Sequence, residues 1–272
     1  MLHDQNRLIK SIPDLAEREQ NSRKDMKQFF LNKNLENEKT FKSVTAQYFE
    51  EQGQRVLASL EGKKAIKAGI NIEDEVAIAV ELFAPEYQKM VVEFNKTANE
   101  LTGGNVPISE KMLKMIRDNV KYFAEEINKT TQNDLQKLIA KSITEGWTYT
   151  ELSKEIKALF NNYSVNADKT KESRSDTIAR TEVNWAKNMT FRDNFARNKY
   201  TEGFEWLATL DDFTRDSHAE ADGLFRPKGY KFPIWSDELS RYEYLEYPGD
   251  RSASAGNTIN CRCTLIPVIN MD

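Results

Sequence analysis

The stretch Phe204-Glu205-Trp206-Leu207-Ala208-Thr209-Leu210 marks the point where the pattern of apolar residues in this chain changes. Phe204, Trp206, Ala208 and Leu210 fall at every second position, a period that predicts a β-strand with one face turned to a core. A second strand is predicted over residues 260–269. The sequence before residue 174 shows helical spacing instead. We therefore expect an α+β protein, with a long α-helical N-terminal part followed by a small α+β C-terminal domain.

Upstream of this stretch, apolar residues recur three or four positions apart, which is the spacing of amphipathic helices. One helix is predicted from Phe41 to a break at Gly62. The next contains Pro85, which is expected to kink it or restart it. Residues 1–40 are polar and charge-dense, and we expect either an amphipathic helix that needs a partner or a partly ordered arm.

A long helix is predicted from the capping residue Ser109 to Gly146. Thr148 and Glu151 then form a capping box, in which each side chain bonds the other residue's backbone N–H, so a further helix should start there. The polar stretch 161–173 is expected to be a linker, and Ser175-Asp176 should open the next helix. These boundaries divide the chain into an N-terminal helical region (1–105), a helical connector with the linker (106–173) and an α+β domain (174–272).

The composition excludes several classes of protein. The 272 residues contain 43 acidic and 39 basic side chains, a net charge of −4 that argues against a non-specific nucleic-acid coat. Two cysteines cannot make a disulfide-rich secreted scaffold, and a reducing compartment is expected. The N-terminus resembles no signal peptide, no apolar run is long enough to span a membrane, and no glycine-rich phosphate-binding loop occurs.

The best candidate site is a set of metal-ligating residue types. If residues 217–221 form a helical turn, His218 and Asp222 lie four apart and face the same way. Cys261 and Cys263 lie two apart on the last predicted strand, so their thiols share a face. Together the four side chains could bind one zinc ion. The alternatives are a pair of buried thiols with His218 bonded to a carboxylate, or a strained disulfide.

The sequence gives less support for a catalytic role of the same region. Asp211 or Asp212 could orient His218 beside a cysteine, but no residue stands out as a nucleophile. A nuclease would use His218 as a base with Arg215 or Arg262 stabilising a phosphate, yet the region has a single histidine and no carboxylate cluster. We therefore expect no catalytic residues and no organic cofactor.

Two further features have ordinary explanations. Arg180 and Glu182, near a helix start, are interpreted as a surface pair. Between positions 168 and 199 the chain carries eight basic and five acidic residues, which is typical of a solvated helix face but leaves room for DNA binding.

Taken in order, the motifs of the C-terminal part resemble a known family. They are Ile178-Ala179-Arg180-Thr181-Glu182, Trp206, the Asp212–His218 element, Asp222-Gly223, Tyr247-Pro248-Gly249-Asp250 and Asn260-Cys261-Arg262-Cys263. This order is similar to the C-terminal domain of the Mu F-like minor head proteins, or head morphogenesis proteins, of tailed bacteriophages. The resemblance covers about residues 135–272, and the ending Asn-Cys-Arg-Cys after an Asp-x-x-Thr-Arg-x-x-His element is its most specific part.

The resemblance implies a low-copy protein of the phage head that aids head morphogenesis, DNA packaging or DNA delivery and has no established enzyme activity. Its implied partners are the portal protein, a capsid or scaffolding protein and phage DNA, with no membrane. Its implied location is the virion, in the head interior or at the portal vertex, after assembly in the host cytoplasm. The long amphipathic helices are expected to supply the partner-facing surface.

Two alternatives stay open. One is a nuclease-like or ADP-ribosyltransferase-like enzyme domain carried in the virion, although Glu243 and Glu246 have the wrong spacing for a transferase. The other is a DNA-binding protein that escorts the genome.

Overall fold

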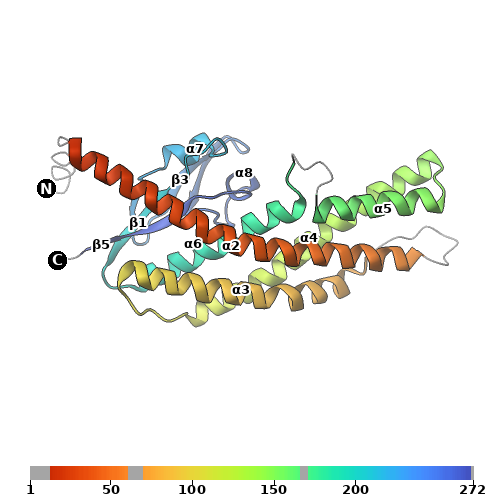
Figure 1. Ribbon diagram of the computed structural model, residues 1–272, viewed down its shortest axis with the longest axis horizontal. Coiled ribbons are helices and arrows are strands. Elements are labelled where there is room, and N and C mark those ends of the chain that lie inside the picture. The colour runs from red at the N-terminus through yellow and green to blue at the C-terminus, as the bar shows by residue number, and fades with distance from the viewer. Residues whose placement is uncertain (1–12, 61–69, 166–170, 271–272) are drawn as a thin grey trace.

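The structure is a computed structural model and describes residues 13–60, 70–165 and 171–270, with side chains described from residue 22 onward. Five helices come first: α2 (Pro13–Leu60), α3 (Ile72–Thr102), α4 (Glu110–Glu145), α5 (Tyr149–Ser164) and α6 (Arg174–Arg197). The strands follow, with two short helices between them, α7 (Asp216–Glu220) and α8 (Ala255–Thr258). Figure 1 shows the strands gathered at one end of an elongated molecule, with α2 running along most of its length. The α+β class predicted from the sequence is confirmed.

The predicted helix ends are largely confirmed, because the capping residues act as expected. Ser109 and Thr148 cap α4 and α5, Thr148 forms the capping box with Glu151, and Gly146 ends α4 in a left-handed conformation. None of the helices in the described ranges has a run of apolar sequence long enough to cross a membrane.

Several helix boundaries differ from the predictions. α2 is one continuous helix of 48 residues. From Pro13 onward, the polar segment before Phe41 is therefore part of this helix and not a partly ordered arm. α3 runs through Pro85 without restarting. α5 extends to Ser164, inside the predicted linker, and the next helix is capped by Ser173 rather than opened by Ser175. Ser173 bonds Asp176 in a second capping box that the sequence interpretation overlooked.

The strands form two small antiparallel sheets. One has the order β2-β1-β5, with β2 at Phe225–Pro227, β1 at Thr201–Leu207 and β5 at Thr264–Ile269. The other pairs β3 (Phe232–Ser236) with β4 (Arg241–Leu245). β1 ends three residues earlier than predicted, and β5 begins only after both cysteines. Leu210 and Asn260 have left-handed backbone and cannot continue a strand, and the Ala208 N–H bonds the Asp222 carboxylate instead of a neighbouring strand.

α6 lies between the helical part and the sheet, packed against α2 and α3 on one side and β5 on the other. Its buried side chains are unusually polar and include Asn184, Lys187, Asn188 and Asn194. The prediction that the basic run is a solvated helix face holds only in part, because Lys187 is buried between the two layers whereas Arg197 and Lys199 are exposed. The division of the chain into three parts, at residues 105 and 173, stays a prediction. α6 begins just after the second boundary and contacts helices that precede both boundaries as well as β5.

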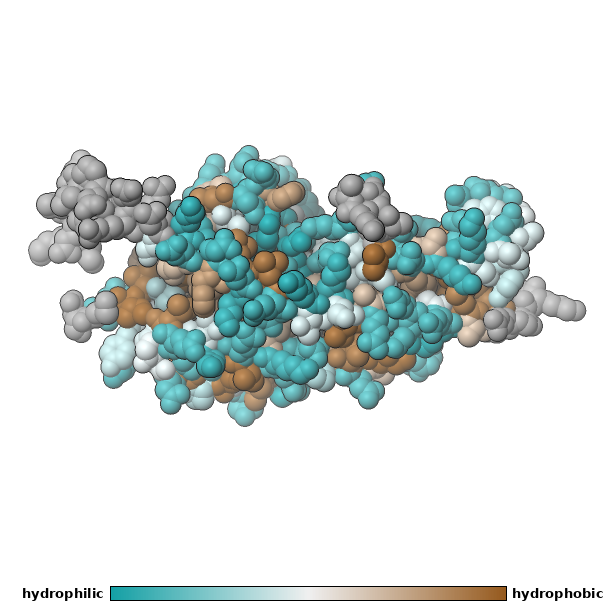
Figure 2. Space-filling view, in the orientation of Figure 1, coloured by the Kyte–Doolittle hydropathy of each residue, from teal (hydrophilic) through white to brown (hydrophobic). Residues whose placement is uncertain are grey.

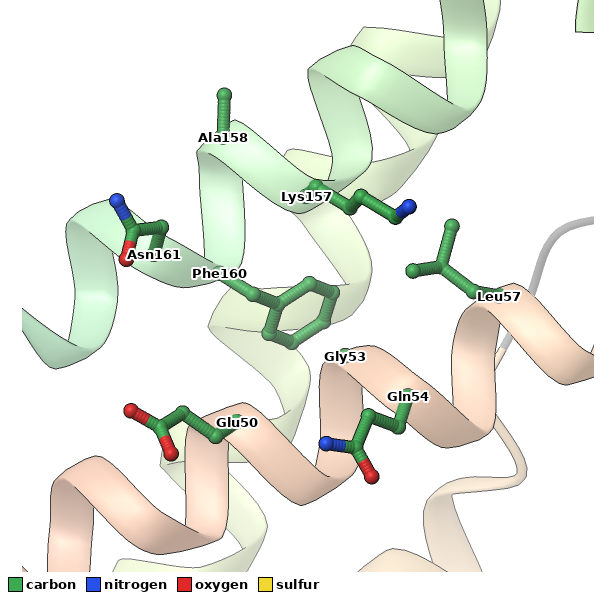
Figure 3. A pocket seen from close by; sticks show the side chains of 8 residues that line it. All are labelled: Glu50, Gly53, Gln54, Leu57, Lys157, Ala158, Phe160 and Asn161. Carbon is green, nitrogen blue, oxygen red and sulfur yellow. The ribbon is translucent and has the colours of Figure 1, made fainter. Parts of the chain in front are cut away.

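α2 and α5 cross closely at Gly53. A side chain at that position would place its Cβ 2.8 Å from the ring of Phe160, so only glycine allows this approach. Figure 3 shows Phe160 directed at Gly53, with an open groove beside the crossing that is lined by Glu50, Leu57 and Lys157 among others. The apolar stripes of the helices are buried in internal contacts of this kind.

Candidate metal centre

His218, Cys261 and Cys263 form a buried cluster in the C-terminal part. His218 lies on the short helix α7 (Asp216–Glu220), and the cysteines lie on the segment that leads into β5. The Nδ1 atom of His218 is 3.7 Å from the Sγ atom of Cys261 and 3.5 Å from that of Cys263. The exposed fractions are 1%, 2% and 3% in that order. The structure thus brings together three of the four residues predicted as metal ligands.

Ion pairs and hydrogen bonds around the cluster fix the two segments. Arg262, between the cysteines, pairs with Asp211 at 2.7 Å, and Arg215 donates to the carbonyl of Ile259. From the other side, the Asn188 amide donates to the Cys263 carbonyl and accepts from the Leu265 N–H. The thiols therefore point at His218 because their backbone is held from both sides.

The neighbours of the cluster are apolar or cationic. The Trp206 ring meets the His218 imidazole edge to face, with centroids 5.3 Å apart. Lys187 is buried and donates to the Thr264 hydroxyl at 2.8 Å. Burial lowers the pKa of Lys187 to about 8, against the opposing effect of the two nearby sulfurs.

The two thiols differ in acidity because they share a hydrogen bond. The hydrogen bond from Cys263, together with His218, holds the pKa of Cys261 well below its usual range. The same bond, with burial, raises the pKa of Cys263. The Cys261 thiolate and the His218 imidazole are both ligand types that thiophilic cations favour.

Three buried polar atoms next to the cluster have no hydrogen-bond partner among the described residues. They are Nε2 of His218, Nε1 of Trp206 and Oγ1 of Thr209. Buried polar groups in proteins are nearly always satisfied. The Trp206 N–H interacts with the Cys263 thiol, and a metal ion held by Nδ1 would leave Nε2 of His218 as an N–H donor on the other side of the ring.

The donor set and spacing fit a tetrahedral metal ion. For zinc, sulfur ligands at about 2.3 Å and a nitrogen ligand at about 2.0–2.1 Å give ligand separations of roughly 3.5–3.8 Å. The two distances from Nδ1 fall in that range, and the three ligand atoms lie within 4.8 Å of one another. The arrangement can bind a thiophilic divalent cation through two thiolates and one imidazole.

Asp222, the fourth predicted ligand, lies elsewhere. Its carboxylate accepts hydrogen bonds from Arg23 at 3.0 Å, Lys27 at 3.3 Å and the Ala208 N–H at 2.8 Å. The prediction placed it on the helical face of His218, but α7 ends at Glu220, so the four-residue spacing no longer brings the two side chains together. Asp222 instead connects α2 to the end of β1.

The residues proposed for catalysis are occupied by other contacts. Asp211 bonds Arg262 and Thr214 rather than orienting His218. Arg215 is bound to a backbone carbonyl.

The interpretation of Arg180 and Glu182 as a surface pair is wrong. Glu182 is buried and accepts hydrogen bonds from Tyr87 and Arg251, which joins α3, α6 and the turn after residue 247. Arg180 instead contacts Glu172 and Asn260. Side chains two residues apart on a helix point in different directions, and that spacing was the available signal. No pattern in the sequence marked Lys187 or Asn188.

Comparison with known proteins supports the resemblance noted in the sequence. The family model described as Phage Mu protein F like protein matches residues 133–266, a segment that contains the whole cluster. An uncharacterized protein of Haemophilus influenzae is 28% identical over 175 residues, 63% of this chain. Those residues are 29% of that protein, so the chain spans less than a third of the relative's length. No solved structure matches significantly.

Proposed function

Since residues 133–266 belong to the Phage Mu protein F like family of phage head proteins, we propose that this chain is a minor component of a tailed-phage head that aids its morphogenesis. The proposal includes association with the portal and a contribution to DNA packaging or delivery. The observation that carries it is the family match. The matched segment runs from α4 through β5 and includes every residue of the buried cluster.

We propose that the chain acts by binding rather than by catalysis. A substrate must reach the reacting groups, whereas His218 and both cysteines are almost fully buried. The cluster also lies behind α7 and the Asp211–Arg262 ion pair. These features suit a centre that stabilises the domain.

Of the alternatives, a DNA escort has weaker support, because only part of the basic run around α6 is exposed. The basic run around α6 provided that support, and Lys187 at its centre is buried and bonded to Thr264. Arg174 is likewise directed inward, with its guanidinium 4.6 Å from the Tyr163 ring centroid.

The role in the head is tested with a phage that lacks this gene. Portal and shell proteins should still be made, but heads should assemble poorly or deliver DNA inefficiently. A plasmid copy should restore both, and His218→Ala should reduce infectivity only as far as it reduces folded protein. A His218→Ala chain that folds and enters heads normally yet abolishes infectivity would point to catalysis instead.

We further propose that the cluster binds one zinc ion as a structural staple. Zinc would tie α7 to the segment before β5 and add its binding free energy to the folding of the C-terminal part. His218, Cys261 and Cys263 would hold the ion, and Lys187 would lie close enough to balance thiolate charge.

Elemental analysis of purified protein tests this second proposal. One zinc per chain is expected for the native protein and for Asp222→Asn, because Asp222 bonds Arg23 and Lys27 instead. Cys261→Ser should lose the metal. Native protein purified without chelators that holds no stoichiometric metal would contradict the proposal and leave the thiols as buried apolar groups.

A further inference from the structure

The β3–β4 hairpin has two unlike faces. Its inner face buries Phe232, Ile234 and Leu245, and Phe232 packs on Trp206, 5.5 Å between ring centroids. Cross-strand partners share a face, so the pairs Pro233–Tyr244 and Trp235–Tyr242 both point outward. Three aromatic rings therefore stand on a sheet face that no described element covers.

Exposed apolar side chains concentrate around this hairpin. Six of the seventeen large hydrophobic side chains exposed in the described part of the chain lie between residues 225 and 244. Helices α2 to α5 together expose only six, and Figure 2 shows the visible face of the helices mostly covered by hydrophilic residues. The main apolar stripes of the helices pack against one another, and the expectation that the helices supply the partner-facing surface stays a prediction.

The hairpin also leaves one strand edge open. β3 lies against α7 and α8 (Ala255–Thr258), whereas β4 is the outer strand of the pair. Tyr242 and Tyr244, on this outer strand, are 58% and 63% exposed. Arginine, tryptophan and tyrosine are the residues most often found at the energetic centres of protein interfaces.

Charge around this face is not balanced locally. Among the described residues, no carboxylate lies within ion-pair distance of any of the four basic side chains in this stretch, which are Arg226, Lys228, Lys231 and Arg241. Of the three carboxylates there, Glu238 and Glu243 accept hydrogen bonds from residues 254–257, and Asp237 makes no such bond. Arg241 interacts electrostatically with Glu243 on the same strand, whereas no ion pair of the described residues involves Arg226, Lys228 or Lys231. Such cations beside exposed aromatic rings are complementary to a carboxylate-bearing surface.

We infer that the outward face of the β3–β4 hairpin, centred on Trp235, Tyr242 and Tyr244, docks on an acidic surface of another protein in the assembled head. The inference rests on the proposed function and names the surface through which the chain joins the assembly. The aromatic rings supply the buried contact, and Lys231 and Arg241 pair with carboxylates of the partner.

A protein partner fits these observations better than a nucleic acid. Binding of a polyanion relies on many phosphate contacts, and this face offers four cations on a chain whose net charge is −4. A second copy of the chain would bring like charges together, since it would present the same four cations.

Zero-length crosslinking of purified heads tests the chemistry of the partner. A carbodiimide joins a lysine amine to a carboxylate that it contacts, so mass spectrometry should find Lys231 linked to an Asp or Glu of a different head protein. Linkage only to another copy of this chain would overturn the inference in favour of self-association. Absence of any Lys231 linkage in heads that contain the protein would also overturn it.

Substitutions on the outward face of the β3–β4 hairpin provide a second test of the inference. Tyr242→Ala with Tyr244→Ala should lower the copies per head about tenfold or more, as expected when interface centres are truncated. Arg241→Glu should lower it further than Arg241→Ala. The matched control is Tyr122→Ala with Tyr149→Ala, which removes two exposed tyrosines from helices and should leave incorporation unchanged.

Three results separate the possible failures. If the native chain is absent from heads, the proposed function fails. If the native chain is present and the hairpin variants, folded by circular dichroism, enter heads normally, the docking inference alone fails. If the variants enter heads normally but lose photocrosslinks to packaged DNA, the face binds nucleic acid instead.

Discussion

Two buried polar centres in this molecule are built in opposite ways. In the helical part, Tyr48, Gln52 and Asn128 bond one another, and Glu75 accepts two hydrogen bonds from Arg55 at 2.7 and 2.8 Å. Burial, followed by the charge of Glu75, raises the pKa of Tyr48 and keeps its hydroxyl protonated as a donor. Apart from the Gln52 amide oxygen, the polar side-chain atoms buried in this centre have partners.

The cluster of His218, Cys261 and Cys263 differs because its surroundings do not complete it. Three neighbouring polar atoms lack partners, although the thiols and the imidazole are held in place from both sides. A self-satisfied network needs only the chain to fold. If the proposed zinc ion binds to this cluster, the stability of the C-terminal part depends on it.

The largest effect should follow from Cys263→Ser. Loss of one thiolate removes the proposed metal and its folding free energy, at least ~5 kcal/mol, which corresponds to a fall in melting temperature of about 10 °C or more. Calorimetry of native and variant protein, each with and without a chelator, measures this. The chelator should destabilise only the native chain. Equal melting curves in all four samples would contradict the idea that the His218 cluster, unlike the centre around Glu75, depends on a bound metal.

Glu75→Ala should have the next largest effect, about 2–3 kcal/mol of unfolding free energy. It leaves the Arg55 guanidinium and the Tyr48 hydroxyl without their shared acceptor. Urea unfolding at fixed pH gives the value, and metal content should stay that of the native protein. Loss of metal in this variant would mean that the two centres are coupled.

A smaller effect is expected from pH at Lys187. Its pKa is about 8 in the folded protein and ~10.4 in the unfolded chain, so the unfolded state binds more protons between these values. The contribution of Lys187 to stability is therefore greatest at high pH and is lost as pH falls toward 8. Between pH 8 and 9.5 the native protein should gain about 1.5 kcal/mol more than Lys187→Met does. Parallel pH profiles of the two proteins would show that burial does not lower the pKa of Lys187.

The smallest effect, about 1 kcal/mol, should come from Thr148→Ala at the start of α5. The change breaks a reciprocal cap far from both centres. Hydrogen exchange should rise in the first turn of α5 alone, and the neighbouring Thr150→Ala, which removes no cap, should leave it unchanged. Faster exchange around His218 would show that the helical part supports the cluster at long range.

Local signals in the sequence predicted local structure well. The caps at Ser109 and Thr148, the stop at Gly146 and the strand at residues 204–207 depend on near neighbours, so their residue types suffice. The meeting of His218 with Cys261 and Cys263 was one of the arrangements expected, because the three side chains are metal-ligating types at spacings that place them on shared faces.

Features that depend on contact between the helical part and the C-terminal part could not be predicted from such local signals. α6 carries polar residues at positions that both layers bury, so its hydropathy pattern resembled that of an exposed helix. The role of Glu182 requires Tyr87 and Arg251, which lie 95 and 69 residues away in the chain. Asp222 failed as a ligand because one turn of helix ended two residues too early.

The continuous length of α2 restricts how this protein can vary in evolution. Near one end Arg23 and Lys27 reach the C-terminal part, and near the other Gly53 meets Phe160, with about 39 Å of helix between residues 27 and 53. One inserted residue between them would turn one contact face by about 100° relative to the other. Relatives that keep both contacts should therefore differ in this stretch by lengths near whole turns, such as about 7 or 11 residues, and a single-residue gap should mark a lineage that has lost one contact.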